Sequence, residues 1–305
     1  MGAAAPESRH TMKWQGRRQS TNVNDQRGRP VAGRTVAKGG LGVVAALVLF
    51  LLTGNGSFLT DLLGGGVQAP PAPSGRESGY TETAREKTLF EYVSVALADI
   101  EDTWNQVLPR SQYRAQYEEP RLTIYNDYVD TACGSANSGV GPFYCPGDKT
   151  IYLDLSFYDT LVQRYGAQDG DFVMTYVIAH EAGHHVQTLL GVTRELSALR
   201  QQAASGAISQ ADFNRYSVAY ELQADYLAGV VARYMQQRGY LERGDLTEAM
   251  SAAAAVGDDA IQQKAQGYAD PDTFNHGTSE QRQEWFKRGY EAGDLSDWDT
   301  FREII

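Results

Sequence analysis

The sequence has little cysteine, little histidine and no excess of positive charge. Its 305 residues include two Cys and five His, and the formal net charge is −11. A nucleic-acid-binding protein needs a basic face, so this charge argues against that class and no nucleic-acid partner is expected. Neither cysteine lies in a C-x-x-C pair, which argues against a zinc site built from thiolates.

The positive charge that is present is concentrated at the N-terminus. Residues 1–38 hold eight Lys/Arg against two Asp/Glu, a net +6, which leaves −17 for residues 39–305. The same 38 residues lack apolar periodicity. They are therefore predicted to be a disordered basic arm, separate from an acidic globular part.

Long apolar runs are scarce, with one exception directly after the arm. Residues 39–54 carry no charge and residues 55–67 carry only Asp61, which together approach the roughly 17–25 apolar residues of a spanning helix. The positive-inside pattern then predicts one transmembrane anchor at residues 39–63, with a cytoplasmic N-terminus and an extracytoplasmic domain at the cell membrane. A buried core helix is the alternative, and the long charged region disfavours a cleaved signal peptide.

The rest of the chain divides into a linker and one folded domain. Residues 64–79 are rich in Pro, Gly and Ser and are predicted to be a linker. Residues 80–305 predict a mostly helical α+β domain with one small sheet. Apolar spacing from Leu89 to Trp104 indicates a first helix. The pattern then predicts strands at 121–125, 141–144 and 150–155 and helices at about 171–190, 193–204, 209–237, 245–265 and 278–291.

The two cysteines lie in the strand-rich part of this domain. In an extracytoplasmic domain, Cys133 and Cys145 are expected to form a disulfide that closes a short loop. Two reduced, buried thiols are the alternative.

One motif carries chemistry: residues 177–185 (VIAHEAGHH) contain H-E-x-x-H. Positions i and i+4 share a helix face, so His180 and His184 can reach one zinc ion at about 2.0–2.1 Å. Glu181 is turned about 100° away and is expected to act as the general base on a zinc-activated water. The apolar residues before the motif predict a buried helix, which argues against a chance match on a solvated one. His185 points elsewhere and is expected to pack or to support a ligand rather than bind metal.

A catalytic zinc needs a third protein ligand. Gln187 and Leu190 stand where the extended metzincin motif has Gly and His, which excludes that class. Glu221 and Asp225 lie four residues apart, so they share a helix face. Glu221 is predicted to complete a His2Glu site for one catalytic Zn²⁺, and Asp225 to accept the second ring N–H of a ligand histidine. A solvated acidic face is the alternative, weakened by the apolar neighbours of both residues.

These residues are similar to a known arrangement. H-E-x-x-H followed by E-x-x-x-D looks like the gluzincin pattern, and nearly the whole chain resembles the bacterial neutral zinc metallopeptidase family. The resemblance is carried by residues 12–23 (MKWQGRRQSTNV), 25–28 (DQRG), 132–134 (ACG), 141–146 (GPFYCP), 151–154 (IYLD), 180–185 (HEAGHH), 221–225 (ELQAD), 276–279 (HGTS) and 282. It implies a zincin-like fold and a peptidase that acts on peptide or protein substrates. It also implies that the protein can begin near Met12.

The resemblance implies roles for two further parts of the chain. In gluzincins an edge strand before the motif helix pairs with the substrate backbone, which here corresponds to residues 138–144, with a plain hairpin strand as the alternative. A downstream His or Arg often polarises the scissile carbonyl in similar peptidases, which makes His276 and Arg282 candidate catalytic residues. A helix-start histidine and a structural salt bridge are the alternatives.

The sequence thus predicts a membrane-anchored zinc metallopeptidase. The rival interpretations are a zinc-containing binding or scaffold protein and a hydrolase of non-peptide amides. The glutamate at position 181 favours an enzyme, because a purely structural zinc site has no use for a base beside an open position.

Overall fold

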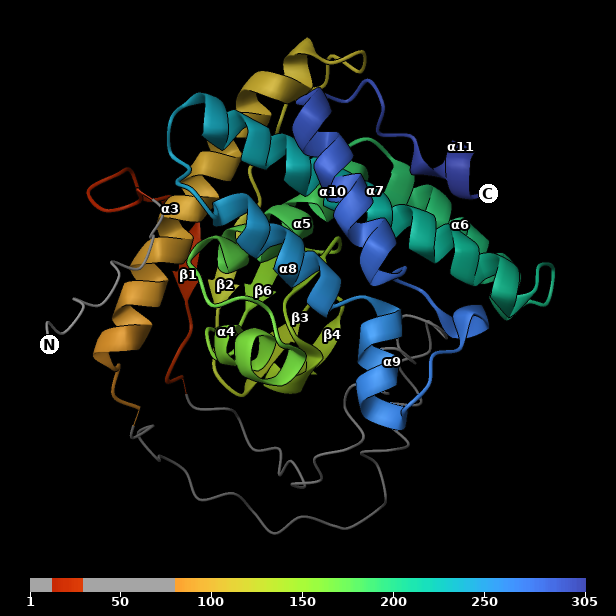
Figure 1. The fold of residues 1–305 in the computed structure, drawn as a ribbon, viewed down its shortest axis with the longest axis horizontal. Helices are drawn as coiled ribbons and strands as arrows, with labels where there is room; N and C mark the ends of the chain where they lie inside the picture. Colours follow the sequence, from red (N-terminus) through yellow and green to blue (C-terminus); the bar gives the residue numbers. More distant parts are fainter. Residues whose placement is uncertain (1–12, 30–79) are drawn as a thin grey trace, which may run out of the picture.

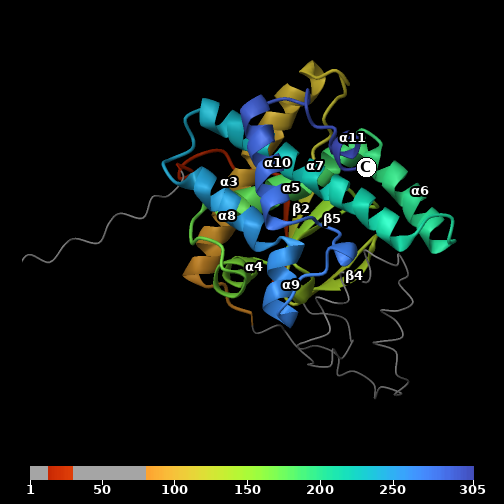
Figure 2. The same ribbon diagram turned by 45° about the vertical axis from the view of Figure 1, so that its right-hand side comes forward.

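The computed structural model describes residues 13–29 and 80–305. Within these ranges the protein is a mixed α+β structure, mostly helical, with a four-stranded sheet and a two-stranded hairpin. Helix α5 runs through the middle, between the sheet and the pair α7 and α10 (Figure 1; Figure 2 shows a second view). The α-helices are α3 (Ala84–Val107), α4 (Phe157–Asp159), α5 (Phe172–Leu189), α6 (Val192–Ala204), α7 (Gln210–Gln237), α8 (Asp245–Ala255), α9 (Asp258–Gln266), α10 (Ser279–Ala292) and α11 (Thr300–Ile304).

The four-stranded sheet has the order β1-β2-β6-β5. Strands β1 (Val23–Asp25), β2 (Arg121–Ile124) and β6 (Thr150–Leu153) run parallel, and β5 (Phe143–Cys145) pairs antiparallel to β6. All four residues of β6 are buried, as expected for a strand covered on both faces. Strands β3 (Tyr128–Thr131) and β4 (Gly134–Asn137) form the separate hairpin.

Residues 13–29 are ordered, which corrects the predicted disordered arm for this part of it. Strand β1 pairs in register with β2, with Val23 opposite Leu122. The Trp14 indole is buried edge-on against Tyr92. The Arg17 guanidinium pairs with the buried carboxylate of Asp99. A basic segment that looked solvated therefore binds acids of α3 that have to be paired when buried.

The predicted single-pass membrane localisation is contradicted. No helix in residues 13–29 and 80–305 is long and apolar enough to cross a membrane. The predicted span at 39–63 and the predicted linker at 64–79 lie outside the described residues. The β1–β2 pairing also opposes the predicted topology, because hydrogen-bonded strands lie on the same side of any membrane. A single crossing between residues 25 and 121 would separate these two strands.

The crossing of α7 and α10 depends on two glycines. A Cβ on Gly229 would lie 2.0 Å from the Phe286 carbonyl oxygen, and one on Gly289 would lie 1.8 Å from the Tyr226 oxygen. The two helix backbones therefore touch where any larger residue would push them apart. Nearer the start of α10, Arg282 meets Asp225 in the middle of α7.

The single helix predicted at 245–265 is instead two helices, α8 and α9, separated at Gly257. A Cβ on Gly257 would lie 2.4 Å from the Ser279 backbone nitrogen, so the start of α10 presses against this point. Asp258, the first residue of α9, accepts backbone N–H groups from Asn275, His276 and Gly277 through Oδ2. The break thus fixes the loop that leads into α10.

Cys133 and Cys145 form a disulfide that links the β3–β4 turn to the end of β5. The predicted strand at 138–144 is only partly a strand, because residues Ser138–Val140 form a 3₁₀ turn and β5 begins at Phe143. β5 hydrogen-bonds only to β6 among the strands of the described ranges, so it is an edge strand of the sheet.

Candidate metal centre

The two histidines of the H-E-x-x-H motif lie on α5, one turn apart. Residues 172–187 of this helix are all buried, because the sheet, α7 and α8 surround it. The rings of His180 and His184 meet edge to face, with centroids 4.7 Å apart. Gly183 lies between them at a point where a Cβ would come within 3.1 Å of the Ala224 backbone. The glycine of the motif therefore lets α7 approach the histidine pair.

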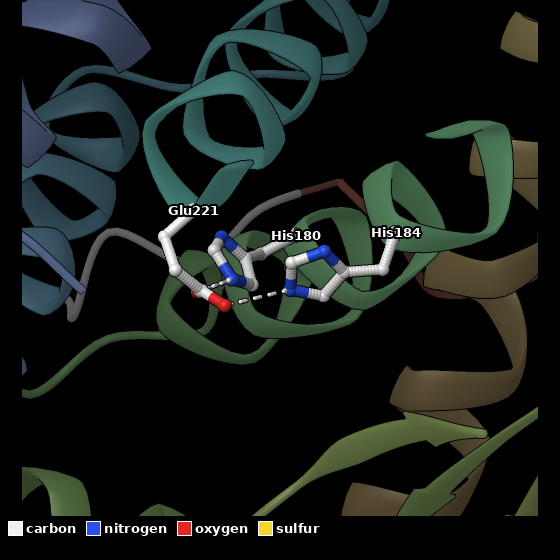
Figure 3. A group of neighbouring side chains, drawn as sticks. All are labelled: His180, His184 and Glu221. Carbon is white, nitrogen blue, oxygen red and sulfur yellow. Dashed lines mark hydrogen bonds and ion pairs between the residues drawn. The ribbon is translucent and has the colours of Figure 1, made fainter. Parts of the chain in front are cut away.

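Glu221, on α7, is the carboxylate that faces both imidazoles (Figure 3). Its Oε2 lies 3.2 Å from His180 Nε2 and its Oε1 lies 3.6 Å from His184 Nε2. Potential ligand atoms of the three residues all fall within 4.8 Å of one another. Two ligands about 2.0–2.1 Å from one tetrahedral zinc are roughly 3.4 Å apart. The observed separations match that value, so the donor set fits zinc.

The other ring nitrogen of each histidine is held by a hydrogen-bond acceptor. His180 Nδ1 lies 2.8 Å from Asp225 Oδ1, and His184 Nδ1 lies 2.8 Å from Gln187 Oε1. A carboxylate and an amide oxygen only accept hydrogen bonds, so both Nδ1 atoms carry the proton. The Nε2 atom of each ring is then the one that faces Glu221, in the position from which a metal ion can be bound.

Asp225 is the centre of a buried polar network. It accepts hydrogen bonds from the Tyr176 hydroxyl at 2.6 Å and from Arg282 Nε at 2.8 Å, besides the contact with His180. Burial acts to raise the pKa of Asp225, but the charges of Arg282 and His180 outweigh it, so the pKa is lowered and the group stays ionised. A charged acceptor is thereby held behind His180.

The same charges act on His180. Burial lowers its pKa, but the Asp225 and Glu221 carboxylates raise it more, to about 10. Glu221 has a pKa well below its ordinary value, chiefly because the facing histidines outweigh the effect of burial. In the metal-free protein this group of side chains therefore holds a proton that a metal ion displaces on binding.

Gln187 belongs to this site, although the sequence analysis used it only to exclude metzincins. Besides contacting His184, it donates hydrogen bonds to the Tyr220 carbonyl at 2.8 Å and to Gln223 Oε1 at 2.9 Å. The signal that could have identified it is its position three residues after His184, on the same helix face.

Glu181 is buried beside the histidines, at 8% exposure. Its charge adds to the effects that raise the pKa of the Tyr220 phenol, after the larger effect of burial. The Tyr220 ring stacks on His184 at 4.8 Å between centroids. Glu181 is therefore close to Tyr220, whose ring covers one face of the candidate metal ligand His184.

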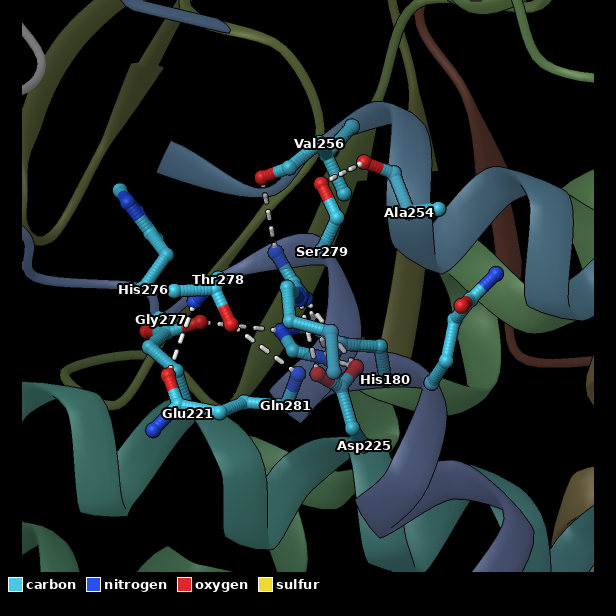
Figure 4. Close-up of polar contacts among 12 residues, drawn as sticks. His180, Glu221, Asp225, Ala254, Val256, His276, Gly277, Thr278, Ser279 and Gln281 are labelled. Carbon is cyan, nitrogen blue, oxygen red and sulfur yellow. Dashed lines mark hydrogen bonds and ion pairs between the residues drawn. The ribbon is translucent and has the colours of Figure 1, made fainter. Parts of the chain in front are cut away.

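His276 and Arg282 occupy different places around the site. The Arg282 guanidinium is buried behind His180, on Asp225 and the Tyr176 hydroxyl, at the start of α10. A capping box of Thr278 and Gln281 begins that helix (Figure 4). His276 lies outside the three-residue ligand group, with its Nδ1 3.0 Å from Asp258 Oδ1. It lines a cavity together with Glu221.

His185 faces away from the metal ligands. Its Nε2 contacts the Glu118 carbonyl oxygen at 2.5 Å and its Nδ1 lies 2.9 Å from the Tyr144 hydroxyl on β5. Since a carbonyl only accepts, Nε2 carries the proton and Nδ1 accepts from Tyr144. Burial lowers the pKa of His185 and keeps it neutral. The residue ties the motif helix to the edge strand.

Comparisons with known proteins find one matching family and several similar proteins. A family model described as "Putative neutral zinc metallopeptidase" matches residues 12–301. The chain is 45% identical over 300 residues to "Uncharacterized protein YpfJ" of Escherichia coli K12, which covers 96% of this chain and 100% of that protein. It is 44% identical over 212 residues to "Uncharacterized protein Rv2575" of Mycobacterium tuberculosis H37Rv, which covers 66% of this chain and 67% of that protein. No solved structure matches the chain, and the zincin-like fold stays a prediction.

Proposed function

The chain belongs to the neutral zinc metallopeptidase family, and we propose that it hydrolyses peptide bonds with one zinc ion held by His180, His184 and Glu221. The observation that carries the proposal is that the Nε2 atoms of His180 and His184 face one carboxylate, with all three groups within reach of a common ion. Bound there, zinc would polarise a carbonyl and lower the pKa of a water molecule. Asp225 and Gln187 keep the two imidazoles in the orientation and tautomer that this requires.

Glu181 is the proposed general base. It sits one residue after His180 on the buried face of α5, next to the ligands without being one of them. Its carboxylate accepts the proton of the attacking water and passes it to the amine that leaves when the peptide bond breaks. The net reaction adds one water across the bond, and Glu181 ends in its starting form.

His276 and Arg282 take different proposed roles. Burial acts to lower the pKa of His276, but Asp258 outweighs it and the pKa is raised, which favours the positively charged ring near Glu221. We assign it to stabilising negative charge on the carbonyl oxygen as the water adds. Arg282 acts through Asp225, so it is a positioning residue rather than one that touches substrate.

The free edge of β5 is the proposed place for the substrate backbone. An extended peptide can add to a sheet edge through main-chain hydrogen bonds. β5 is tied to the motif helix by the contact between Tyr144 and His185. A peptide paired there lies alongside the helix that carries the histidines.

The test compares two variants of the full chain, measured for zinc content and for cleavage of a proteome-derived peptide mixture. Glu181→Gln should keep one zinc per chain and lose at least 100-fold in turnover, because the base is removed and the ligands remain. Glu221→Ala should lose the zinc itself. Full zinc occupancy with unchanged turnover in Glu181→Gln would refute the mechanism and favour a structural zinc. Turnover of simple amides but of no peptide would point to a non-peptide hydrolase.

A further inference from the structure

A small cavity adjoins the candidate metal centre. Its volume is about 40 Å³, and its lining includes Arg200 of α6, Tyr220 and Glu221 of α7, and Asn275 and His276 of the loop before α10. Glu221 is one of the three residues that face the common metal position, and Tyr220 stacks on His184. A group bound in this cavity would therefore lie next to the reacting bond.

Two residues of the lining, Arg200 and Asn275, each have a buried hydrogen-bond donor with no partner among the described residues. These donors are Nε of Arg200 and Nδ2 of Asn275. Asn275 as a whole is 4% exposed. A buried donor left unsatisfied costs about 1–3 kcal/mol, and more when it is charged. Such donors at the edge of an active site indicate a ligand that accepts hydrogen bonds.

The charge of Arg200 narrows the class of ligand. No carboxylate in residues 13–29 and 80–305 forms an ion pair with it, whereas the buried guanidinium of Arg282 has one. The guanidinium carbon of Arg200 lies over the face of the Phe213 ring, 5.7 Å from the ring centroid. Burial lowers the pKa of Arg200, yet a guanidinium stays charged in proteins. A half-buried, unpaired cation of this kind favours an anion.

The size of the cavity narrows the class further. One water molecule needs about 10–15 Å³ of such volume, so the cavity has room for roughly three water-sized groups. A carboxylate fits this space, whereas an aromatic or long aliphatic side chain does not. Arginine and an amide N–H₂ are both suitable donors to the two oxygens of a carboxylate.

We propose that Arg200 and Asn275 form a subsite that binds a carboxylate of the substrate next to the scissile bond. This inference rests on the proposed peptidase function and specifies its substrate class. The carboxylate has two possible sources, the C-terminal group of a peptide or the side chain of an Asp or Glu residue. The first source makes the enzyme a carboxypeptidase, and the second makes it an endopeptidase with acidic preference.

The experiment measures peptide binding to the zinc-loaded Glu181→Gln full chain by calorimetry, so that cleavage does not interfere. The probes are N-acetylated neutral hexapeptides in two matched sets. One set compares the free acid with the carboxamide. The other set uses peptides with a C-terminal carboxamide and places one Asp or Glu at each position in turn. Each of these peptides is compared with the one that has Asn or Gln at the same position. Adding Arg200→Gln to the Glu181→Gln chain should lower the affinity for the carboxylate-bearing peptide of each pair by roughly 10- to 100-fold, because a charge-assisted hydrogen bond is lost. The affinity for the neutral peptide of the same pair should not change.

Three further variants sharpen the result. Arg194→Gln removes a charge from an exposed position of the same helix and should change nothing. Asn275→Asp places a negative charge in the lining and should weaken carboxylate binding. Arg200→Lys keeps the charge but not the planar geometry and should retain part of the preference. Equal binding of both members of every pair, a preference that survives Arg200→Gln, or no binding of any peptide would overturn the subsite.

The same peptides incubated with the zinc-loaded wild-type chain separate this proposal from the proposed function. Cleavage without a carboxylate preference would keep the peptidase and remove the subsite. A carboxylate preference in binding, with no cleavage of any probe by the wild-type chain, would keep the subsite and count against peptide hydrolysis. A preference in the free-acid set identifies the peptide C-terminus as the source of the carboxylate. A preference in the Asp/Glu set identifies an acidic side chain.

Discussion

Replacing Asp225 by Asn tests whether one buried carboxylate both supports the fold and orients a metal ligand. Asp225 is 0% exposed and contacts Tyr176, His180 and both Nε and Nη2 of Arg282 at 2.6–3.0 Å. Asn has nearly the same shape but no charge, so the variant leaves the Arg282 guanidinium buried without a counter-ion. His180 then has only a neutral acceptor behind it.

Two effects of different size are expected. Breaking a buried ion pair by removing one partner costs about 3–5 kcal/mol of unfolding free energy. For a domain of this size each kcal/mol lowers Tm by roughly 2–4 °C, so the metal-free variant should melt about 6–20 °C lower than the wild type. Loss of the charged acceptor behind a ligand histidine should weaken zinc affinity roughly 10- to 100-fold. Thermal unfolding and competition with a chelator measure the two quantities separately.

A second substitution separates the two roles of Asp225. In Asp225→Asn/Arg282→Met neither charge is left buried alone, so much of the stability should return. Zinc affinity should stay low, because His180 still lacks its carboxylate. The control is Asp297→Asn, which removes a carboxylate from an exposed ion pair with Arg288 and should change stability by less than about 1 kcal/mol. Wild-type zinc affinity in Asp225→Asn, or full recovery of affinity in the double variant, would refute the orienting role.

Two other predictions concern the N-terminal segment and the proton of the metal-free site. Trp14→Ala should lower the unfolding free energy by about 3 kcal/mol, because it leaves a cavity against Tyr92. Urea denaturation measures this, with Lys13→Ala at the exposed neighbouring position as the control. Equal losses of unfolding free energy in the two variants would contradict the packing of residues 13–29. Zinc binding at pH 7 should release at least one proton, because Asp225 and Glu221 raise the pKa of metal-free His180 to about 10 against the effect of burial and the metal needs the neutral ring. Zinc affinity should therefore rise with pH between 7 and 10. Calorimetry in two buffers of different ionisation enthalpy counts the protons, and a count of zero would be incompatible with the electrostatics of the site.

The helices were largely predictable because their signals are local. Apolar spacing predicted α3, α5, α6, α7 and α10 to within a few residues. The failures have a common cause. The split between α8 and α9 follows from the contact of Gly257 with Ser279, and β1 forms because β2, about 100 residues later, offers it an edge. In both cases the residues that determine the local structure, Ser279 and strand β2, lie outside the sequence segment whose structure they change.

The candidate site shows the same division. The spacing of four residues placed His180 and His184 on one face of a helix, since helical geometry alone relates i to i+4. The same spacing placed Glu221 and Asp225 together, but spacing alone does not determine which carboxylate faces Nε2 and which faces Nδ1, so the assignment of Glu221 as the ligand, with Asp225 behind it, was a prediction from side-chain length and position. The packing of α5 on α7 across Gly183 decides this, with Glu221 toward Nε2 and Asp225 toward Nδ1 of His180.

By itself the sequence determined the donor types, their helical spacing and the family to which the chain belongs, because these depend on residues that are neighbours along the chain or in a motif. Only the tertiary structure decided that Arg282 pairs with Asp225 behind His180, and that residues 13–29 join the sheet. It also decided that Arg200 and Asn275 line one cavity with unpartnered donors. These contacts join residues tens to about a hundred positions apart, or depend on which side chain finds a partner after packing, and no local pattern encodes either.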